Sequence, residues 1–483
     1  MQAIPHTLAA AALAAVLAGC ASGPEFIAPA APAVTHYTST PSHTPTVQAD
    51  VPLGNAQRIA EDLPVEATWW RAFGSAALDD TIARALQASP TLAAAQARLA
   101  EAQALQQARS GATELPRVDL GAGVQRQHAS PAAQGQSGDG RTFGLYSASV
   151  GVHYQLDLSG ANRRRLEALA ARSDWRRHEL AAARLTLAGQ IAGTAIARAR
   201  LAAQIDANHT LLLSQEEQVA LAQRRVTLGQ AAPDEAMALQ SQAAQTRATL
   251  PLLRQQLEQA EHLLAVLAGQ APGAAEIHAF TLRDFTLPAD LPLVVPSELV
   301  RQRPDIQASE ALLHAAHAER GATIAGRYPQ LNLSAAIGSQ ALTSGALFGG
   351  GSALWSLAGQ LTQPLFNAAQ PAQERAADAA LDAAAAQYQS VVLQALRSVA
   401  DALRAMANDA QALQALADAD TAAQAALQTA SERHRLGSIS YAQLLLTQQQ
   451  AQQVHMQLAG AQAQRLTDTV ALYQAIGSDP LRE

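Results

Sequence analysis

Few residues in this sequence could carry out catalysis, and they form no recognisable catalytic group. The chain contains no Lys, which excludes a Lys-dependent phosphate loop, a Ser-x-x-Lys pair and a Schiff-base lysine. His314 and His317 lie on one face of a predicted helix, but no third ligand accompanies them, so we interpret them as a surface pair. Gly349-Gly350-Gly351 is not followed by a helix start with a Lys and is typical of a loop tip. We therefore expect no enzyme activity, no metal and no cofactor.

The single cysteine, Cys20, has the setting of a lipid-attachment site. Residues 8–17 form an apolar stretch of the size found in signal peptides, too short to span a bilayer. The stretch ends in Leu17-Ala18-Gly19-Cys20, which resembles the lipobox of bacterial lipoproteins, in which the cysteine is acylated and becomes the first residue. We expect a signal peptide at 1–19, although its start lacks Lys and Arg. Because Ala21 and not Asp follows Cys20, the same resemblance favours the outer membrane. A simple signal peptide with an unrelated Cys is the alternative.

Composition and charge exclude several classes of protein. Hydrophobic residues make up 49% of the 483 residues, but aromatic residues only 4%. Small side chains allow helices to approach closely but fill a thick globular core poorly. The net charge of −7 is mild for this length and argues against a nucleic-acid-binding protein.

Two tracts predict helices of unusual length, residues 163–228 and 371–436. Each would be roughly 100 Å long at the helical rise per residue. In the second tract, apolar residues from Val392 to Ala417 recur at spacings of four and three, which indicates a seam packed against a partner helix.

Each tract ends in Leu-Gly, at Leu228-Gly229 and Leu436-Gly437, where Gly can adopt the left-handed conformation that ends a helix. Return helices are expected at 233–267 and 439–476. The residues before the two tips correspond, Arg225 to Leu228 with Arg433 to Leu436, which indicates an internal repeat.

Four segments alternate with the period of a β-strand, one face apolar and the other small or polar. They are residues 117–127, 143–157, 329–341 and 353–364. Each is about ten residues long, which is the length of a tilted transmembrane strand. A soluble, half-buried sheet alternates in the same way and is the alternative. Four strands cannot close a barrel alone, so strands in a membrane would require several copies of the chain.

The predicted organisation is therefore mainly α with a transmembrane β part. The expected segments are a signal peptide (1–19), a lipid-anchored extended segment (20–76), a first repeat (77–269) with a helical hairpin at 161–268, an equatorial linker (270–302), a second repeat (303–477) with a hairpin at 369–476, and a tail (478–483). Helices are also expected at 77–87, 90–110 and 304–326.

Six short motifs carry a resemblance to a known family. They are Leu17-Ala18-Gly19-Cys20, Trp69-Trp70-Arg71-Ala72-Phe73-Gly74, Leu156-Asp157-Leu158-Ser159-Gly160, Arg303-Pro304-Asp305-Ile306, Gln363-Pro364-Leu365-Phe366-Asn367 and the paired Leu-Gly tips. Over nearly its whole mature length the chain resembles the TolC/OprM-like outer-membrane efflux proteins, in particular their NodT-type lipoprotein subgroup. The Arg303 motif is the most specific of the six.

The resemblance implies a homotrimer with a twelve-stranded β-barrel, continued by a long periplasmic α-barrel of helical hairpins. It implies a passive exit duct that conducts drugs or other small toxic compounds out of the periplasm. Its partners would be a periplasmic adaptor, an inner-membrane transporter of the resistance-nodulation-division type and outer-membrane lipid, with no nucleic acid. A type I secretion duct is an alternative within the family, and a coiled-coil lipoprotein without a channel is an alternative outside it.

The resemblance also suggests two functional regions. The tips at Leu228, Gly229, Leu436 and Gly437 are expected to dock the adaptor. In several relatives a carboxylate nine residues after the tip Gly narrows the periplasmic aperture, and Leu446 and Ala238 occupy the matching positions here. We expect Leu446, with Ala442 one turn earlier, to form an apolar constriction, and Glu235 is the next candidate. The alternative is that Leu446 faces a neighbouring helix.

Overall fold

The computed structural model describes residues 24–39, 44–60, 63–130, 135, 137, 139–274 and 276–477. The predicted signal peptide, Cys20 and the tail at 478–483 lie outside the described residues. The chain divides into two compact units, the first containing the described parts of 1–29, 98–176 and 309–388, and the second the remainder. This division is not the sequential one that we expected, because the helices α4 (Ala161–Thr227) and α8 (Gln370–Arg435) each contribute residues to both units.

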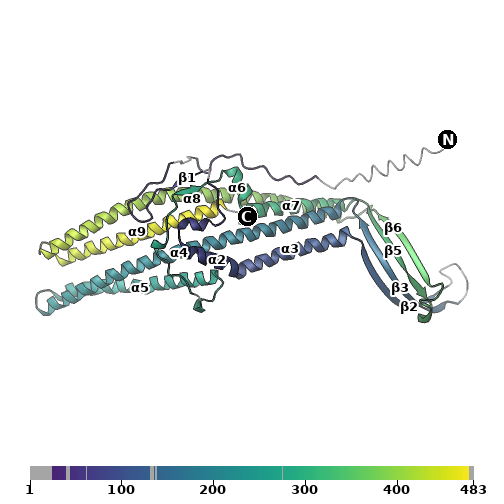
Figure 1. Cartoon of the computed structure of the whole chain (residues 1–483), viewed down its shortest axis with the longest axis horizontal. Helices are drawn as coiled ribbons and strands as arrows, with labels where there is room; N and C mark the ends of the chain where they lie inside the picture. The colour runs from purple at the N-terminus through teal and green to yellow at the C-terminus, as the bar shows by residue number, and fades with distance from the viewer. Residues whose placement is uncertain are drawn as a thin grey trace. The chain divides into compact units, whose positions relative to one another are not determined.

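The first unit contains an antiparallel sheet in the order β2-β3-β5-β6 (Figure 1). The strands are β2 (Arg117–Ala129), β3 (Arg141–Leu156), β5 (Gln330–Ala341) and β6 (Ala353–Thr362). The register aligns one apolar row across all four, namely Leu120, Val150, Ile337 and Trp355. The adjacent row, Asp119, Gly151, Ala336 and Ser356, is small or polar. Because successive side chains point to opposite faces, the sheet has one apolar face and one small, polar face.

Four helices lead to and from these strands. α3 (Pro90–Glu114) precedes β2, α4 follows β3, α7 (Pro304–Ala325) precedes β5 and α8 follows β6. Within the first unit, ion pairs join them, including Arg320 with Asp378 and Arg172 with Glu319. The strand ends are therefore held by a helical base within the same unit.

The second unit contains two helical hairpins, α4 with α5 (Pro233–Leu267) and α8 with α9 (Tyr441–Ile476), whose turns lie at the same end (Figure 1). A buried apolar cluster near these turns contains residues of α4, α5 and α9, which joins the hairpins: Ala222, Ala236, Leu239, Tyr441 and Leu445. Of the described helices only α4 has a stretch apolar and long enough to cross a bilayer. Half of that stretch is buried within the chain, which is what packing against other helices requires.

The remaining elements of the second unit form a small belt. Strand β1 (Arg58–Ala60) pairs in parallel with β4 (Asp290–Pro292), and the helices α2 (Ala76–Ala88) and α6 (Pro296–Gln302) lie in the same unit. Short 3-10 turns occur at Trp69–Phe73, Pro272–Ala274, Leu282–Asp284 and, in the first unit, Ser344–Ala346. The segment 20–76 is thus not extended throughout, because it contains the 3-10 turn at Trp69–Phe73, and the linker 270–302 contains α6 as well as β4. The partners β1 and β4 could not be assigned from sequence, because a three-residue strand has no alternation to detect and its partner lies more than 200 residues away.

Candidate functional site

The sheet exposes its apolar face. Leu120 and Trp355 are 81% and 78% exposed, and Ile337 is 68% exposed. Monomeric soluble proteins seldom leave a contiguous apolar patch of this kind uncovered. The edge strands β2 and β6 each pair on one side only. Among the described residues, the apolar face and the outer edges of β2 and β6 are therefore without a covering partner.

Polar side chains close the junctions between strands and long helices. Asp157, one residue after β3, accepts hydrogen bonds from the backbone N–H groups of Asn162 at 3.0 Å and Arg163 at 2.8 Å. These groups belong to the first turn of α4, which has no partners for them within the helix. Gly160 supplies the left-handed turn, with φ of 75°. Asn367 acts similarly after β6, because its side-chain oxygen accepts from Ala369 N–H at 3.0 Å.

The two tips have the same hydrogen-bonded turn. At the first tip the backbone N–H groups of Gly229 and Gln230 donate to the carbonyls of Val226 and Arg225, at 3.0 and 2.8 Å. At the second tip the N–H groups of Gly437 and Ser438 donate to the carbonyls of His434 and Arg433, both at 2.8 Å. This is the Schellman arrangement, which satisfies the last helix carbonyls when the C′ residue is left-handed. Gly229 and Gly437 have φ of 68° and 74°. Each tip also carries an exposed leucine, Leu228 at 63% and Leu436 at 73%.

The aperture candidates differ in their surroundings. Leu446 is 60% exposed and Ala442 is exposed, whereas Tyr441 and Leu445 of the same helix are buried in the cluster that joins the hairpins. None of the described helices of this chain therefore buries Leu446. Glu235 is half-buried and pairs with Arg225 at 3.6 Å, so its charge is partly neutralised by its own hairpin.

The Arg303 motif connects the start of α7 to the end of α9. Arg303 binds Asp305 through two N–H···O contacts of 2.8 and 3.0 Å and donates to the carbonyl of Ala475 at 2.7 Å. Asp305 also accepts from Ile306 N–H at 3.0 Å, and Ile306 is fully buried. A cation at a helix C-terminus and a carboxylate at a helix N-terminus both interact favourably with the helix dipole. The motif is therefore a structural joint within the second unit.

The Trp69 motif anchors the chain before α2. Trp69 is 2% exposed and stacks on Tyr473 of α9 at 5.3 Å between ring centroids. Trp70 donates to Asp79 at 2.9 Å, and Thr286 N–H donates to the carbonyl of Phe73 at 2.8 Å.

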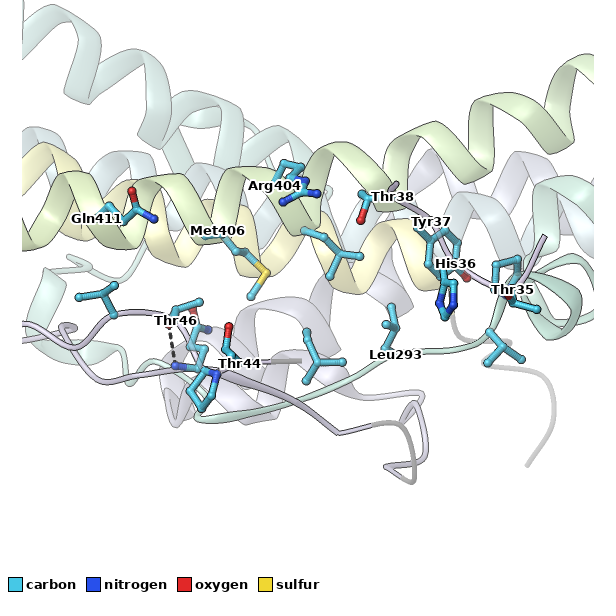
Figure 2. Close-up of a pocket in the computed structure, with 18 residues that line it drawn as sticks. Thr35, His36, Tyr37, Thr38, Thr44, Thr46, Leu293, Arg404, Met406 and Gln411 are labelled. Atoms are coloured by element: carbon cyan, nitrogen blue, oxygen red, sulfur yellow. Dashed lines mark hydrogen bonds between the residues drawn. The ribbon is translucent and has the colours of Figure 1, made fainter. Parts of the chain in front are cut away.

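Arg465 of α9 fixes the segment that precedes β1. This Arg is 1% exposed, and it donates to the carbonyl of Asn55 at 3.1 Å, to Thr46 Oγ1 at 3.2 Å and to Gln57 Oε1 at 2.9 Å. The adjoining residues Thr35–Thr38 and Thr44–Val47 line a cavity of about 220 Å³ together with Leu403 and Met406 of α8. Figure 2 shows Tyr37, Thr46 and Met406 around this cavity. Tyr37 closes one end by donating to the carbonyl of Val294 at 2.5 Å.

A buried carboxyl lies one turn beyond Arg465. Asp468 is 5% exposed, and Gln464 donates to its Oδ1 at 2.8 Å. Burial first, and then the neighbouring Asp409 of α8, raise the pKa of Asp468 to about 7, which Arg465 only partly opposes.

His314 and His317, interpreted as a surface pair, are half-buried, and each contacts other parts of the chain. His314 Nε2 lies 2.8 Å from Glu167 Oε1 of α4, and the ring of Phe26 stacks on His314. Burial lowers the pKa of His317. Within the described ranges no group of three or more His, Cys, Asp and Glu residues could hold a metal ion. The sequence did not show these contacts, because both partners are distant in sequence.

Comparison with known proteins identifies the family. The model of the outer membrane efflux protein family matches residues 81–270 and 295–478. The pyoverdine export outer membrane protein OpmQ of Pseudomonas putida is 31% identical over 430 residues, which cover 86% of this chain and 89% of that one. The antibiotic efflux pump outer membrane protein ArpC of Pseudomonas putida is 29% identical over 476 residues, with coverage of 97% and 95%. The solved structure of the outer-membrane channel OprN is similar with a TM-score of 0.84 and 26% identity, covering 95% of this chain and 99% of that one. The chain therefore belongs to the outer membrane efflux protein family, and its helix-rich fold is that of outer-membrane channels.

Proposed function

We propose that this chain forms a homotrimeric exit duct in the outer membrane, through which an efflux system releases drugs or other small toxic compounds. The observation that carries the proposal is the sheet, with one apolar face uncovered and both edge strands able to accept another partner. Three copies supply twelve strands. Closing them into a barrel pairs every edge and places the apolar row against lipid, as a membrane requires.

The small, polar face of the sheet would then line the lumen. Its Gly, Ser and Ala side chains leave space, and two of its charged residues, Arg117 and Asp119, pair with each other at 2.9 Å. Such a surface offers no catalytic group and no strong site, which suits a passive conduit. The names of relatives, pyoverdine export and antibiotic efflux, support small exported compounds as cargo.

The helices would continue the duct into the periplasm. Each chain has the order helix, two strands, long helix and return helix twice, and the turns at Gly229 and Gly437 have matching hydrogen bonds. We interpret this as an internal duplication, which gives six similar tips in a trimer. The exposed leucines at the tips would contact a periplasmic adaptor that is driven by an inner-membrane transporter. Cys20 would carry a lipid anchor.

A matched pair of substitutions on adjacent residues of β5 tests the proposal. Ile337→Arg places a charge on the apolar face and should prevent insertion, at a cost of about 2–4 kcal/mol per chain. Ala336→Arg places the same charge on the opposite face, so trimers should insert but conduct anions in preference to cations. Native mass spectrometry measures the assembly, and planar-bilayer recordings measure conductance and ion selectivity.

The outcomes separate the candidate functions. A channel would be contradicted if Ile337→Arg and Ala336→Arg assembled and conducted equally, or if the unsubstituted trimer did not conduct. Either result would favour a coiled-coil lipoprotein without a pore. Export of a protein substrate instead of small compounds, in cells that lack the chain and then regain it, would favour a type I secretion duct.

A further inference from the structure

The first residues that the structure describes are held by contacts with α4 and α7 in the first unit. Arg164, in the first turn of α4, donates through Nη2 to the carbonyl of Pro24 at 2.8 Å. Phe26 stacks on His314 of α7 with 4.4 Å between ring centroids and 11° between planes, and meets His317 edge-on at 5.7 Å. Ile27, the next residue, is 86% exposed, so the contact is made by the backbone at Pro24 and the ring of Phe26.

The residues that receive this segment are organised by a carboxylate. Arg164 is 5% exposed and lies 2.7 Å from Glu167 Oε2, while His314 lies 2.8 Å from Glu167 Oε1. Burial raises the pKa of Glu167, but hydrogen bonds from His314 and Arg164 outweigh it and keep the pKa below its usual value. Glu167 therefore stays ionised and orients both the guanidinium and the first imidazole. His314 and His317, three residues apart on α7, provide a face and an edge for one aromatic ring.

We propose that Arg164, Glu167, His314 and His317 form a docking site for the segment Pro24–Phe26, and that this site fixes where the mature N-terminus leaves the folded body. The ligand is a backbone carbonyl followed two residues later by an aromatic ring. The flanking Pro24 and Pro29 restrict the unbound segment, which lowers the entropy lost on docking. The two helices that build the site lie far apart in sequence, so docking also holds them together.

The docking site also restricts the position of a lipid on Cys20, an inference that rests on the proposed acylation of Cys20. Only three residues lie between Cys20 and Pro24. The four Cα-to-Cα steps from Cys20 to Pro24 span roughly 14 Å at most when fully extended. The docked segment therefore keeps a lipid on Cys20 close to the start of α4, where β3 ends in the same unit. The lipid and the apolar face of the sheet would then reach the membrane together, because a tethered group acts at high effective concentration.

Cleavage by chymotrypsin after Phe26 tests the docking in the full chain. The protease must take the Phe26 ring into its own pocket, so cleavage reports the undocked fraction. In the purified trimer we expect much slower cleavage there than in a synthetic peptide of residues 21–32. His314→Ala, at a half-exposed position where Ala keeps the helix intact, should accelerate cleavage about tenfold. Stacking of the Phe26 ring on His314 favours the docked segment over the undocked one by about this factor.

Two matched variants complete the test. Arg164→Ala should accelerate cleavage by at least as much, whereas Arg163→Ala, at the exposed neighbour, should not change it. Cleavage as fast as in the peptide, or rates unchanged by His314→Ala and Arg164→Ala in trimers with unaltered circular dichroism, would overturn the docking site. The Cys20→Ser chain should keep Phe26 protected. Docking that survives in a chain found to carry no lipid would overturn only the anchor.

Discussion

Arg303, the residue before α7, donates to the carbonyl of Ala475 in the last turn of α9 at 2.7 Å, although the two residues are 172 positions apart in the sequence. The side chain of Arg303 is only 13% exposed. Gly477 follows with φ of 70°, and a Cβ at that position would come within 3.0 Å of Arg303 Cγ. The two chain segments are therefore fitted to each other at this point.

This joint predicts a loss of stability on substitution of Arg303. Arg303→Ala removes the pair with Asp305 and leaves the Ala475 carbonyl without this donor. Because Asp305 is 43% exposed and solvent screens the pair, we expect a loss of about 2 kcal/mol in the free energy of unfolding. Arg303→Lys should recover part of it, since the charge stays but the two-pronged contact does not. Thermal unfolding in detergent measures the effect, with the exposed Arg301→Ala as control. A melting temperature equal to that control would contradict the joint.

The joint also shows what the sequence could and could not predict. The long helices were predictable because their signals are local: α8 ends at Arg435 and is followed by Leu436-Gly437, as the helix stop indicated. The pairing of β1 with β4 was not, because three residues carry no period. Arg164 is one of three consecutive arginines. Its burial depends on Pro24 and Glu167, so the sequence could not show which arginine is buried.

Replacing the tip glycines should impair efflux more than assembly. Gly229→Val and Gly437→Val force a β-branched residue to φ near 70°, which costs about 1–2 kcal/mol at each turn and distorts the exposed leucine beside it. Gly437→Asn should be milder, because Asn tolerates this conformation. Drug susceptibility and cross-linking to the adaptor measure docking, and native mass spectrometry measures assembly. Gly460→Ala, in an open position of α9, is the control. Normal export and cross-linking in both Val variants would place docking elsewhere.

The buried carboxyl of Asp468 predicts a pH dependence of stability. Its pKa of about 7 in the folded chain lies above the ordinary value of 3.8. The folded chain therefore binds this proton more tightly than the unfolded chain, and the stabilisation is complete below about pH 4 and is lost as the pH rises towards 7. Asp409 of α8 and Arg465 and Gln464 of α9 face the group.

Asp468→Asn should remove this dependence and give a more stable protein than the unsubstituted one above pH 7. Unfolding curves at several pH values between 4 and 8 measure the difference between the two proteins. Asp401→Asn, at an exposed position paired with Arg397, is the control and should leave the slope unchanged. A constant difference across this range would show that Asp468 does not titrate there.

Acylation of Cys20 predicts a defined mature N-terminus. Mass spectrometry of the purified protein should show a lipid-modified Cys20 as the first residue. Cys20→Ser should reduce the amount of assembled trimer more than the conductance of each trimer, because the proposed barrel would also hold the protein in the membrane. An unmodified N-terminal peptide that begins elsewhere would contradict the anchor.

Leu446 predicts an apolar constriction at the periplasmic entrance. Its side chain is 60% exposed, while Leu445 beside it is buried, so Leu446 is available to pack against other copies of the chain in the proposed trimer. Apolar rings restrict ions by excluding water from a narrow pore. Leu446→Ala should therefore raise conductance and admit larger antibiotics. Leu446→Asp should create a ring of three carboxylates. Divalent cations bound to this ring should then block the pore.

Single-channel recordings with and without added Mg²⁺ measure both effects. Ala238→Asp, nine residues after the other tip, is the matched variant, since it places the same charge at the corresponding exposed position of the first hairpin. If Leu446→Ala and Leu446→Asp both conduct as the unsubstituted trimer does, Leu446 does not line the aperture. Glu235 then becomes the next residue to substitute, because it lies near the first tip and its pair with Arg225 fixes its position within the hairpin.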